Sequence, residues 1–136
     1  MRPRLLVVDA SALVEYLLQT ERGRRIERHL THPDADLHVP EICDVEVVSA
    51  LRGLERRGEL DARRSREGVE DYLALPLLRH RHTAFVPRTF EMRENLSPYD
   101  AMYLSLAEGL AAPFLSGDDR LTRAAGRWTD VELLDA

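Results

Sequence analysis

Two acidic residues stand just after short apolar runs, at positions where an α/β protein could build a charged site. Asp9 follows residues 5–8, and Asp118 comes shortly after residues 114–115. A short apolar run of this kind is typical of a strand buried in a parallel sheet. Because open α/β sheets bind ligands at the carboxyl ends of their strands, the sequence predicts that these two carboxylates share one site.

Two further acids, Glu46 and Asp100, are surrounded by residues that favour burial. Glu46 is expected on a helical stripe of apolar and small residues, namely Ile42, Ser49, Ala50 and Gly53. Asp100 is expected in the first turn of a helix whose next residues are mostly core-forming. A carboxylate at such a place is expensive to bury without a partner. A structural role also stays open for each acid, as a helix cap, as a first-turn residue favoured by the helix dipole, or as the partner of an arginine.

Four carboxylates in one cleft would require a compensating charge. Carboxylates about 4 Å apart repel each other by several kcal/mol at an effective dielectric of about 20, so a proton or a cation must lie among them. A set of oxygen ligands without histidine or cysteine favours Mg²⁺ or Mn²⁺ over zinc. Such a site suits the hydrolysis of a phosphodiester bond by metal-activated water.

The composition excludes several other kinds of chemistry. The 136 residues carry a formal net charge of -5, and all 19 basic residues are arginine. Without lysine, the chain has neither the lysine of a phosphate-binding loop nor one that could form a Schiff base. Cys43 is the single cysteine, so no internal disulfide can form, which favours the cytoplasm.

The length favours one soluble domain spanning residues 1–136, since separate cores usually need roughly 100 residues each. The apolar run at residues 5–8 is too short for the core of a signal peptide. No charge-free stretch approaches the ~18 residues that would indicate a membrane span, so no membrane association is expected.

Alternating short strands and helices are predicted around the four acids. Strands are expected at residues 5–8, 37–39, 77–78, 113–115 and 131–134. Helices are expected at residues 12–18, 21–30, 40–57, 61–75, 83–94, 97–110 and 118–125. Pro40 suits the first turn of the third helix, and Ser97 suits the N-cap of the sixth. This order predicts a parallel α/β sandwich.

Four segments in this order resemble the PIN-domain ribonucleases, and more narrowly the VapC toxins of bacterial toxin-antitoxin pairs. They are Val-Asp-Ala-Ser at 8–11, Pro40 with Glu46 six residues later, Asn-Leu-Ser-Pro-Tyr-Asp-Ala at 95–101 with Tyr103, and Leu-Ser-Gly-Asp at 115–118. The likeness extends over essentially the whole chain. It departs from the family at Ser116, where threonine is commoner, and at Ser49, where asparagine is frequent.

The resemblance implies a PIN-like α/β/α sandwich with a mostly parallel central sheet of four to five short strands. It implies an endoribonuclease that depends on Mg²⁺ or Mn²⁺ and is inhibited by a VapB-type antitoxin. The family's acidic quartet corresponds to Asp9, Glu46, Asp100 and Asp118, which would be both the catalytic residues and the metal ligands. Ser11 and Ser116 match small hydroxyl positions that would orient the carboxylates or bound water. A homodimer, and a heterotetramer or larger assembly with the antitoxin, are also implied.

Other functions remain open at this stage. A PIN nuclease that is not a toxin could process RNA or act on DNA with the same residues. A flavodoxin-like module could bind Mg²⁺ without cutting anything, although the lysine that a response-regulator site needs is absent. A scaffold that has kept the acids is a third alternative.

Several groups outside the quartet have uncertain roles. Asp44 and Asp119 adjoin quartet positions. Arginines within residues 24–28, 52–57 and 63–66 could contact RNA phosphates or pair with acids on solvated helix faces. Residues 79–82 alternate arginine and histidine, which on a strand would place both histidines on one face. The apolar positions within residues 13–18 and 26–30 could form an interface or simply the core.

Overall fold

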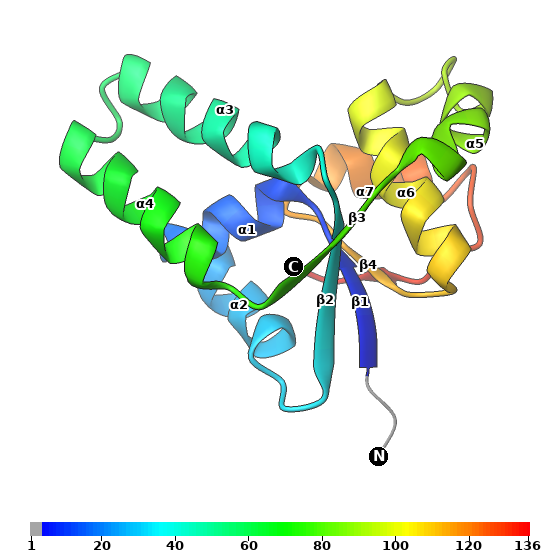
Figure 1. Cartoon of the computed structure of the whole chain (residues 1–136), viewed down its shortest axis with the longest axis horizontal. Helices are drawn as coiled ribbons and strands as arrows, with labels where there is room; N and C mark the ends of the chain where they lie inside the picture. The colour runs from blue at the N-terminus through cyan, green and yellow to red at the C-terminus, as the bar shows by residue number, and fades with distance from the viewer. Residues whose placement is uncertain (1–3) are drawn as a thin grey trace.

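A sheet of five short parallel strands lies at the centre of the part of the chain that the structure describes, residues 4–136 (Figure 1). This computed structural model orders the strands β3-β2-β1-β4-β5. Their bounds are Arg4–Val8 for β1, Ala35–Pro40 for β2, Leu77–His80 for β3, Phe114–Leu115 for β4 and Leu133–Leu134 for β5. The prediction of a mostly parallel sheet of four to five strands is confirmed.

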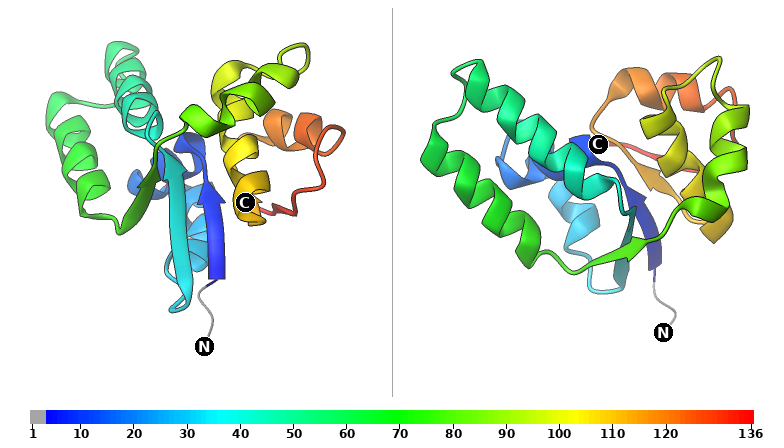
Figure 2. Two further views of the ribbon diagram at one scale, coloured as in Figure 1. Left: turned by 45° about the vertical axis from the view of Figure 1, so that its right-hand side comes forward. Right: turned by 45° about the horizontal axis from the view of Figure 1, so that its top comes forward.

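Helices lie on both sides of the sheet, which gives the predicted α/β/α sandwich (Figures 1 and 2). The helices before β3 are α1 (Ala10–Leu17), α2 (Glu21–Leu30), α3 (Cys43–Arg56) and α4 (Ala62–Ala74). After β3 come the 3₁₀ turn η1 (Thr83–Phe85), α5 (Val86–Glu91), α6 (Pro98–Leu110) and α7 (Asp119–Ala125). Helix α6 packs against β1, β2 and β4. Within residues 4–136, none of the helices is both long and apolar enough to cross a membrane.

The core is built on β1 and the helices beside it. Val7 and Val8 of β1 are fully buried, as expected for a central strand covered on both faces. Leu13 of α1 and Ile26 of α2 are also fully buried. The apolar stripes of these two helices therefore belong mainly to the core, and the alternative of an interface there is wrong.

Most helix starts follow the capping residues that the sequence indicates. The side chains of Asp9, Asp61 and Ser97 accept hydrogen bonds from the first turns of α1, α4 and α6. The expectation for Pro40 is wrong, because it is the last residue of β2 and lies beside His80 in the register with β3. Helix α3 begins only after a turn. The helix expected at residues 83–94 is shorter, because η1 precedes it and α5 ends at Glu91.

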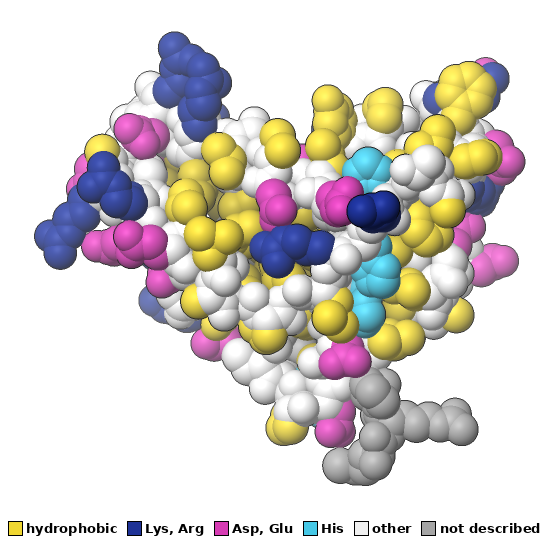
Figure 3. Space-filling model, viewed as in Figure 1, with side chains coloured by type: hydrophobic (Ala, Val, Ile, Leu, Met, Phe, Trp, Pro, Cys, Tyr) yellow, Lys and Arg dark blue, Asp and Glu magenta, His cyan; other side chains and the backbone are white. Residues whose placement is uncertain are grey.

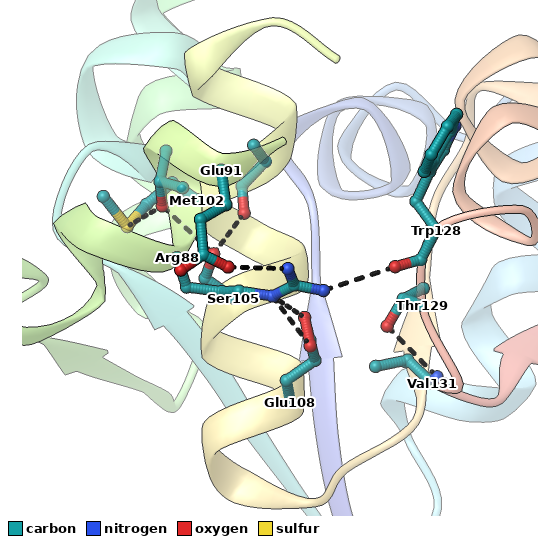
Figure 4. Close-up of polar contacts among 10 residues, drawn as sticks. Arg88, Glu91, Met102, Ser105, Glu108, Trp128, Thr129 and Val131 are labelled. Carbon is teal, nitrogen blue, oxygen red and sulfur yellow. Dashed lines mark hydrogen bonds and ion pairs between the residues drawn. The ribbon is translucent and has the colours of Figure 1, made fainter. Parts of the chain in front are cut away.

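Arg88 connects three separate segments on the α6 side of the molecule (Figure 4). Its guanidinium donates to both carboxylate oxygens of Glu108 on α6, at 3.0 and 3.2 Å, and to Glu91 of α5 at 3.0 Å. It also donates to the backbone oxygen of Trp128, which follows α7. These contacts hold α5 and the segment after α7 against the helix that carries Asp100.

Histidines gather on the face where β2 and β3 lie (Figure 3). The Nδ1 atom of His38 on β2 is 2.7 Å from the Nε2 atom of His80 on β3. Strand β3 ends at His80, so His82 lies outside it and precedes η1. The alternation of residues 79–82 therefore does not form one strand face.

Candidate active site

The carboxyl ends of β1 and β4 bring two distant parts of the chain together. These strands are neighbours, with Val8 beside Leu115, and the backbone N–H of Asp9 donates to the carbonyl of Leu115 at 3.1 Å. Residues 116–118 therefore leave the sheet next to Asp9. This is the arrangement that the strand-end positions of Asp9 and Asp118 predicted.

Asp9 is held by hydrogen bonds to both of its carboxylate oxygens. Oδ1 accepts from the Ser11 hydroxyl at 2.7 Å and from the backbone N–H of Ala12 at 2.9 Å, while Oδ2 accepts from the Ser116 hydroxyl at 2.5 Å. Only 5% of Asp9 is exposed. Burial raises the pKa of Asp9, and the hydrogen bonds from Ser116, Ala12 and Ser11 oppose that rise. The carboxylate is thus fixed in orientation at a place where its charge is costly.

The two serines also order the loop between β4 and α7. The Ser11 hydroxyl accepts from the backbone N–H of Gly117 at 3.0 Å, and the Ser116 hydroxyl accepts from that of Asp118 at 2.9 Å. A side chain at position 117 would lie 3.1 Å from backbone atoms at the start of α1, which explains the glycine there. Ser11 and Ser116 therefore orient Asp9 and place the loop that carries Asp118.

Glu46 lies in the first turn of α3 with part of its carboxylate left without a partner. Its Oε1 atom is buried and has no hydrogen-bond partner among the described residues. Burial raises the pKa of Glu46 to about 7, the Tyr103 hydroxyl opposes that rise, and the charges of Asp100 and Asp9 add to it. Glu46 therefore lies within electrostatic range of both Asp100 and Asp9.

Asp100 and Asp118 are the other two of the four acids. Asp100 lies in the first turn of α6, where its backbone N–H donates to the Ser97 hydroxyl. Burial raises the pKa of Asp100, and the charge of Asp118 contributes to the rise. Asp118 is the N-cap of α7, and its Oδ1 atom accepts from the backbone N–H groups of Arg120 and Leu121. Asp9 and Asp118 are thus helix caps, as the structural alternative expected.

A groove of about 550 Å³ lies between α3 and the start of α6. It is lined by Val45, Glu46, Ser49, Ala50, Ser97, Tyr99 and Asp100. None of the four acids forms an ion pair within residues 4–136. The charge of Arg120 opposes the rise in the pKa of Asp100, but in the described chain Arg120 forms no ion pair with any of the four acids.

The four acids fit a hard divalent cation in charge and in ligand type. The buried, unpartnered Oε1 of Glu46 is the clearest sign, because a carboxylate oxygen in that state lacks the charge that would stabilise it. The carboxylates do not form a finished ligand cage: within residues 4–136, no three His, Cys, Asp or Glu side chains are arranged to hold an ion. Both oxygens of Asp9 and the Oδ1 atom of Asp118 instead accept local hydrogen bonds.

Asp44 and Asp119, the two acids next to quartet positions, bind other residues of the chain. Asp44 accepts from the Tyr72 hydroxyl at 2.6 Å and from Arg79 at 2.8 Å. Burial acts to raise the pKa of Asp44. The hydrogen bonds from Tyr72 and Arg79 and the charge of Arg79 outweigh burial and hold the pKa of Asp44 below its usual value. Asp119 pairs with Arg22 of α2 at 2.6 Å, which lowers the pKa of Asp119. Both acids are thus occupied by cations of the chain.

Arg22 and Tyr103 belong to the surroundings of the site, and sequence reasoning assigned neither a role there. Besides Asp119, Arg22 contacts the carbonyl oxygen of Gly117, so it anchors the loop between β4 and α7. Nothing in the sequence near Arg22 indicates these partners. For Tyr103 a signal existed, since it lies one helical turn after Asp100 and therefore on the same face of α6.

Comparison with known proteins places this geometry in a family. Residues 6–127 match the family model of the PIN domain. Ribonuclease VapC12 of Mycobacterium tuberculosis is 33% identical over 130 residues, which cover 96% of this chain and 99% of that protein. The chain therefore belongs to the PIN domain family, among the VapC ribonucleases.

Solved structures agree with this fold. PAE2754 from Pyrobaculum aerophilum has a TM-score of 0.69 at 24% identity, over 96% of this chain and 83% of that chain. VapBC2 from Rickettsia felis, bound to a DNA fragment from their promoter, has a TM-score of 0.66 at 10% identity, over 96% of this chain and 97% of that chain. At these identities the likeness concerns the fold, which is confirmed as PIN-like.

Proposed function

We propose that this chain is the endoribonuclease toxin of a toxin-antitoxin pair and hydrolyses RNA phosphodiester bonds with Mg²⁺ or Mn²⁺. The observation that supports it most is a group of four acids without ion pairs at the carboxyl edge of a parallel sheet, beside an open groove. The kinship with ribonucleases named VapC supports RNA as the substrate. On this proposal, residues 1–136 act as one PIN-like domain in the cytoplasm.

Asp9, Glu46, Asp100 and Asp118 are the residues that would hold the ion. A divalent cation at such a site neutralises charge on the phosphate and activates water as the nucleophile. Other residues of the chain orient these carboxylates. Ser11 and Ser116 fix the carboxylate of Asp9 from both sides. The open groove beside Glu46 and Asp100 gives a phosphodiester access to the acids.

The toxin assignment also predicts partners. The Rickettsia felis structure is of a VapB and VapC pair, and by analogy we expect a VapB-type antitoxin to bind and inhibit this chain. We further propose that the chain forms a homodimer, and a heterotetramer or larger complex with the antitoxin. Large apolar side chains that stay exposed on α3, α5 and α6 support association, among them Val45, Val48, Phe90 and Tyr99.

Replacing single carboxylates tests the enzymatic part of this proposal. Asp9→Asn or Asp100→Asn removes a ligand charge while keeping the shape of the side chain, so we expect RNA cleavage to fall at least 100-fold with the fold intact. Asp130→Asn is the control, since Asp130 is exposed and is not one of the four acids. Cleavage is measured on total RNA with Mg²⁺ and with EDTA, and folding by circular dichroism.

Each outcome of this experiment decides between functions. Cleavage by the wild type that EDTA abolishes, together with inactive site variants, supports the proposal. An Asn variant that cuts normally removes that residue from the site. A wild-type protein that binds Mg²⁺ but cleaves no RNA contradicts the nuclease and favours a non-catalytic module.

A further inference from the structure

Two histidine rings meet between strand β2 and the edge strand β3. The Nδ1 atom of His38 on β2 lies 2.7 Å from the Nε2 atom of His80 on β3, and the ring centroids are 5.0 Å apart. Strand β3 is at the edge of the sheet and pairs with β2 alone among the described strands (Figure 1). The two rings therefore form a side-chain link across the strand contact that holds β3.

The short distance between the two nitrogens leaves room for one proton. An imidazole nitrogen is either a donor or an acceptor, so one of the two carries N–H and the other a lone pair. His38 is 8% exposed, and its second nitrogen, Nε2, is buried without a hydrogen-bond partner among the described residues. Because a buried N–H group without an acceptor is rare, the proton of His38 belongs on Nδ1, from which it is donated to the lone pair of His80 Nε2.

The pair in this geometry resists the uptake of a further proton. A protonated pair either places two N–H groups against each other across 2.7 Å or puts N–H on the buried Nε2 of His38, which has no acceptor in the described chain. The pair can therefore bind a proton without these costs only when its rings separate. In agreement with this, burial and the proximity of His80 lower the pKa of His38.

Few other charges act on the pair. Asp36 on β2 favours the protonated form of His38, whereas the charge of His80 opposes it. Strand β1 and helices α2 and α6 also pack against β2, but none of their described side chains adds a charge that acts on His38. Arg79 of β3 points to the other face of the sheet, where it pairs with Asp44. Because the pKa of Asp44 is lowered, that ion pair persists at pH 5.

We propose that His38 and His80 form a pH-sensitive link between β2 and β3: the uncharged pair holds the edge strand at neutral pH, and proton uptake in mildly acidic solution separates the rings and opens β3. The link lies outside the four acids and involves neither the divalent ion nor RNA. It therefore goes beyond the proposed function and can be tested without it.

The expected size follows from the ordinary pKa of histidine. When β3 opens, the freed ring regains the ordinary pKa of 6.5, whereas the closed pair binds no further proton. The open state then binds more protons than the closed state, so the closed strand loses stability as the pH falls below 6.5. At pH 5, uptake of one proton shifts the equilibrium about 30-fold toward the open strand.

Hydrogen exchange of residues 77–80 measures this opening. It is followed by mass spectrometry in EDTA at pH 8 and pH 5, with correction for the intrinsic exchange rates. Protection in the wild type should fall about 30-fold between these two values. The double variant His38→Asn, His80→Gln keeps polar amide groups near the two nitrogens but does not titrate, so its protection should change less than about threefold. His32→Gln is the matched control, since His32 is exposed and precedes β2, and it should behave like the wild type. All these proteins keep Glu46, whose own titration therefore cancels in the comparison.

Protection of residues 77–80 that does not change with pH in the wild type, or that falls equally in the double variant, would overturn the link. The ring nitrogens give a second measurement if the double variant does not fold. In ¹⁵N NMR spectra of wild-type histidines at pH 6, both rings of the closed protein should be neutral. Charged rings at His38 and His80 while residues 77–80 stay protected would show that the closed pair accepts protons, and the proposal would fail.

Discussion

Neutralising Glu46 should stabilise the metal-free protein at neutral and alkaline pH. The pKa of Glu46 is raised from 4.5 to about 7, chiefly by burial. The folded protein therefore keeps a proton on Glu46 that the unfolded chain releases over this range. Because the folded state binds more protons than the unfolded state, the free energy of unfolding falls as the pH rises from 4.5 to about 7. Glu46→Gln removes this titration.

The expected size follows from the shift in pKa. Each pKa unit corresponds to about 1.4 kcal/mol, so the charged Glu46 costs up to about 3 kcal/mol of stability above pH 8. Below pH 4.5, where the side chain is neutral in both states, the wild type and Glu46→Gln should be about equally stable. Glu70→Gln is the control, because Glu70 is exposed on α4 and forms no ion pair within residues 4–136.

Urea denaturation in EDTA at a series of pH values measures the difference. The advantage of Glu46→Gln should grow as the pH rises from 4.5 to 8, and Mg²⁺ should reduce it by stabilising the wild type more than the variant. A difference that stays the same across this range would refute the reasoning, since it would show that the stability of the protein does not depend on the charge of Glu46.

Three further changes test the surroundings of the site. Gly23→Ala should cost about 3 kcal/mol of stability or more, because its Cβ would lie 2.0 Å from the carbonyl oxygen of Glu15; urea denaturation measures this, and a loss below about 1 kcal/mol contradicts the close packing. Ser116→Ala removes a donor to Asp9 and should move the acid limb of the pH-rate profile to higher pH, whereas an unmoved limb means that the hydroxyl does not stabilise the carboxylate. Arg22→Gln should speed hydrogen exchange in the loop between β4 and α7, and exchange at the wild-type rate would show that Arg22 does not anchor it.

The fold could be predicted largely because local rules and burial agree along much of the chain. The apolar run before Asp9 predicts a buried strand, and Ser97 predicts the start of α6, as the structure shows. Pro40 was misplaced because the same fixed backbone angle suits a helix start and the end of a strand. Its neighbour across the sheet, His80, decides between the two, and that partner is far away in the sequence.

The site was predictable as far as its acids and the two serines that orient Asp9. Asp9 and Asp118 follow strands, so their position at the sheet edge can be deduced from the sequence. Tyr103 resembles an ordinary core residue of an apolar helix, since its relation to Glu46 depends on how α3 and α6 pack. In the sequence, Arg22 resembles a solvated arginine, because its partners lie in a loop near the other end of the chain.

The strand order has a consequence for the time at which the protein can become active. Asp9 is oriented by Ser116, 107 residues further on, and Asp118 is placed by β4. A growing polypeptide whose β4 is still inside the ribosome lacks the bond from the Ser116 hydroxyl to Asp9 and the bond from the Asp9 N–H to Leu115. The environment that orients Asp9 therefore becomes complete only when synthesis of the chain is nearly finished.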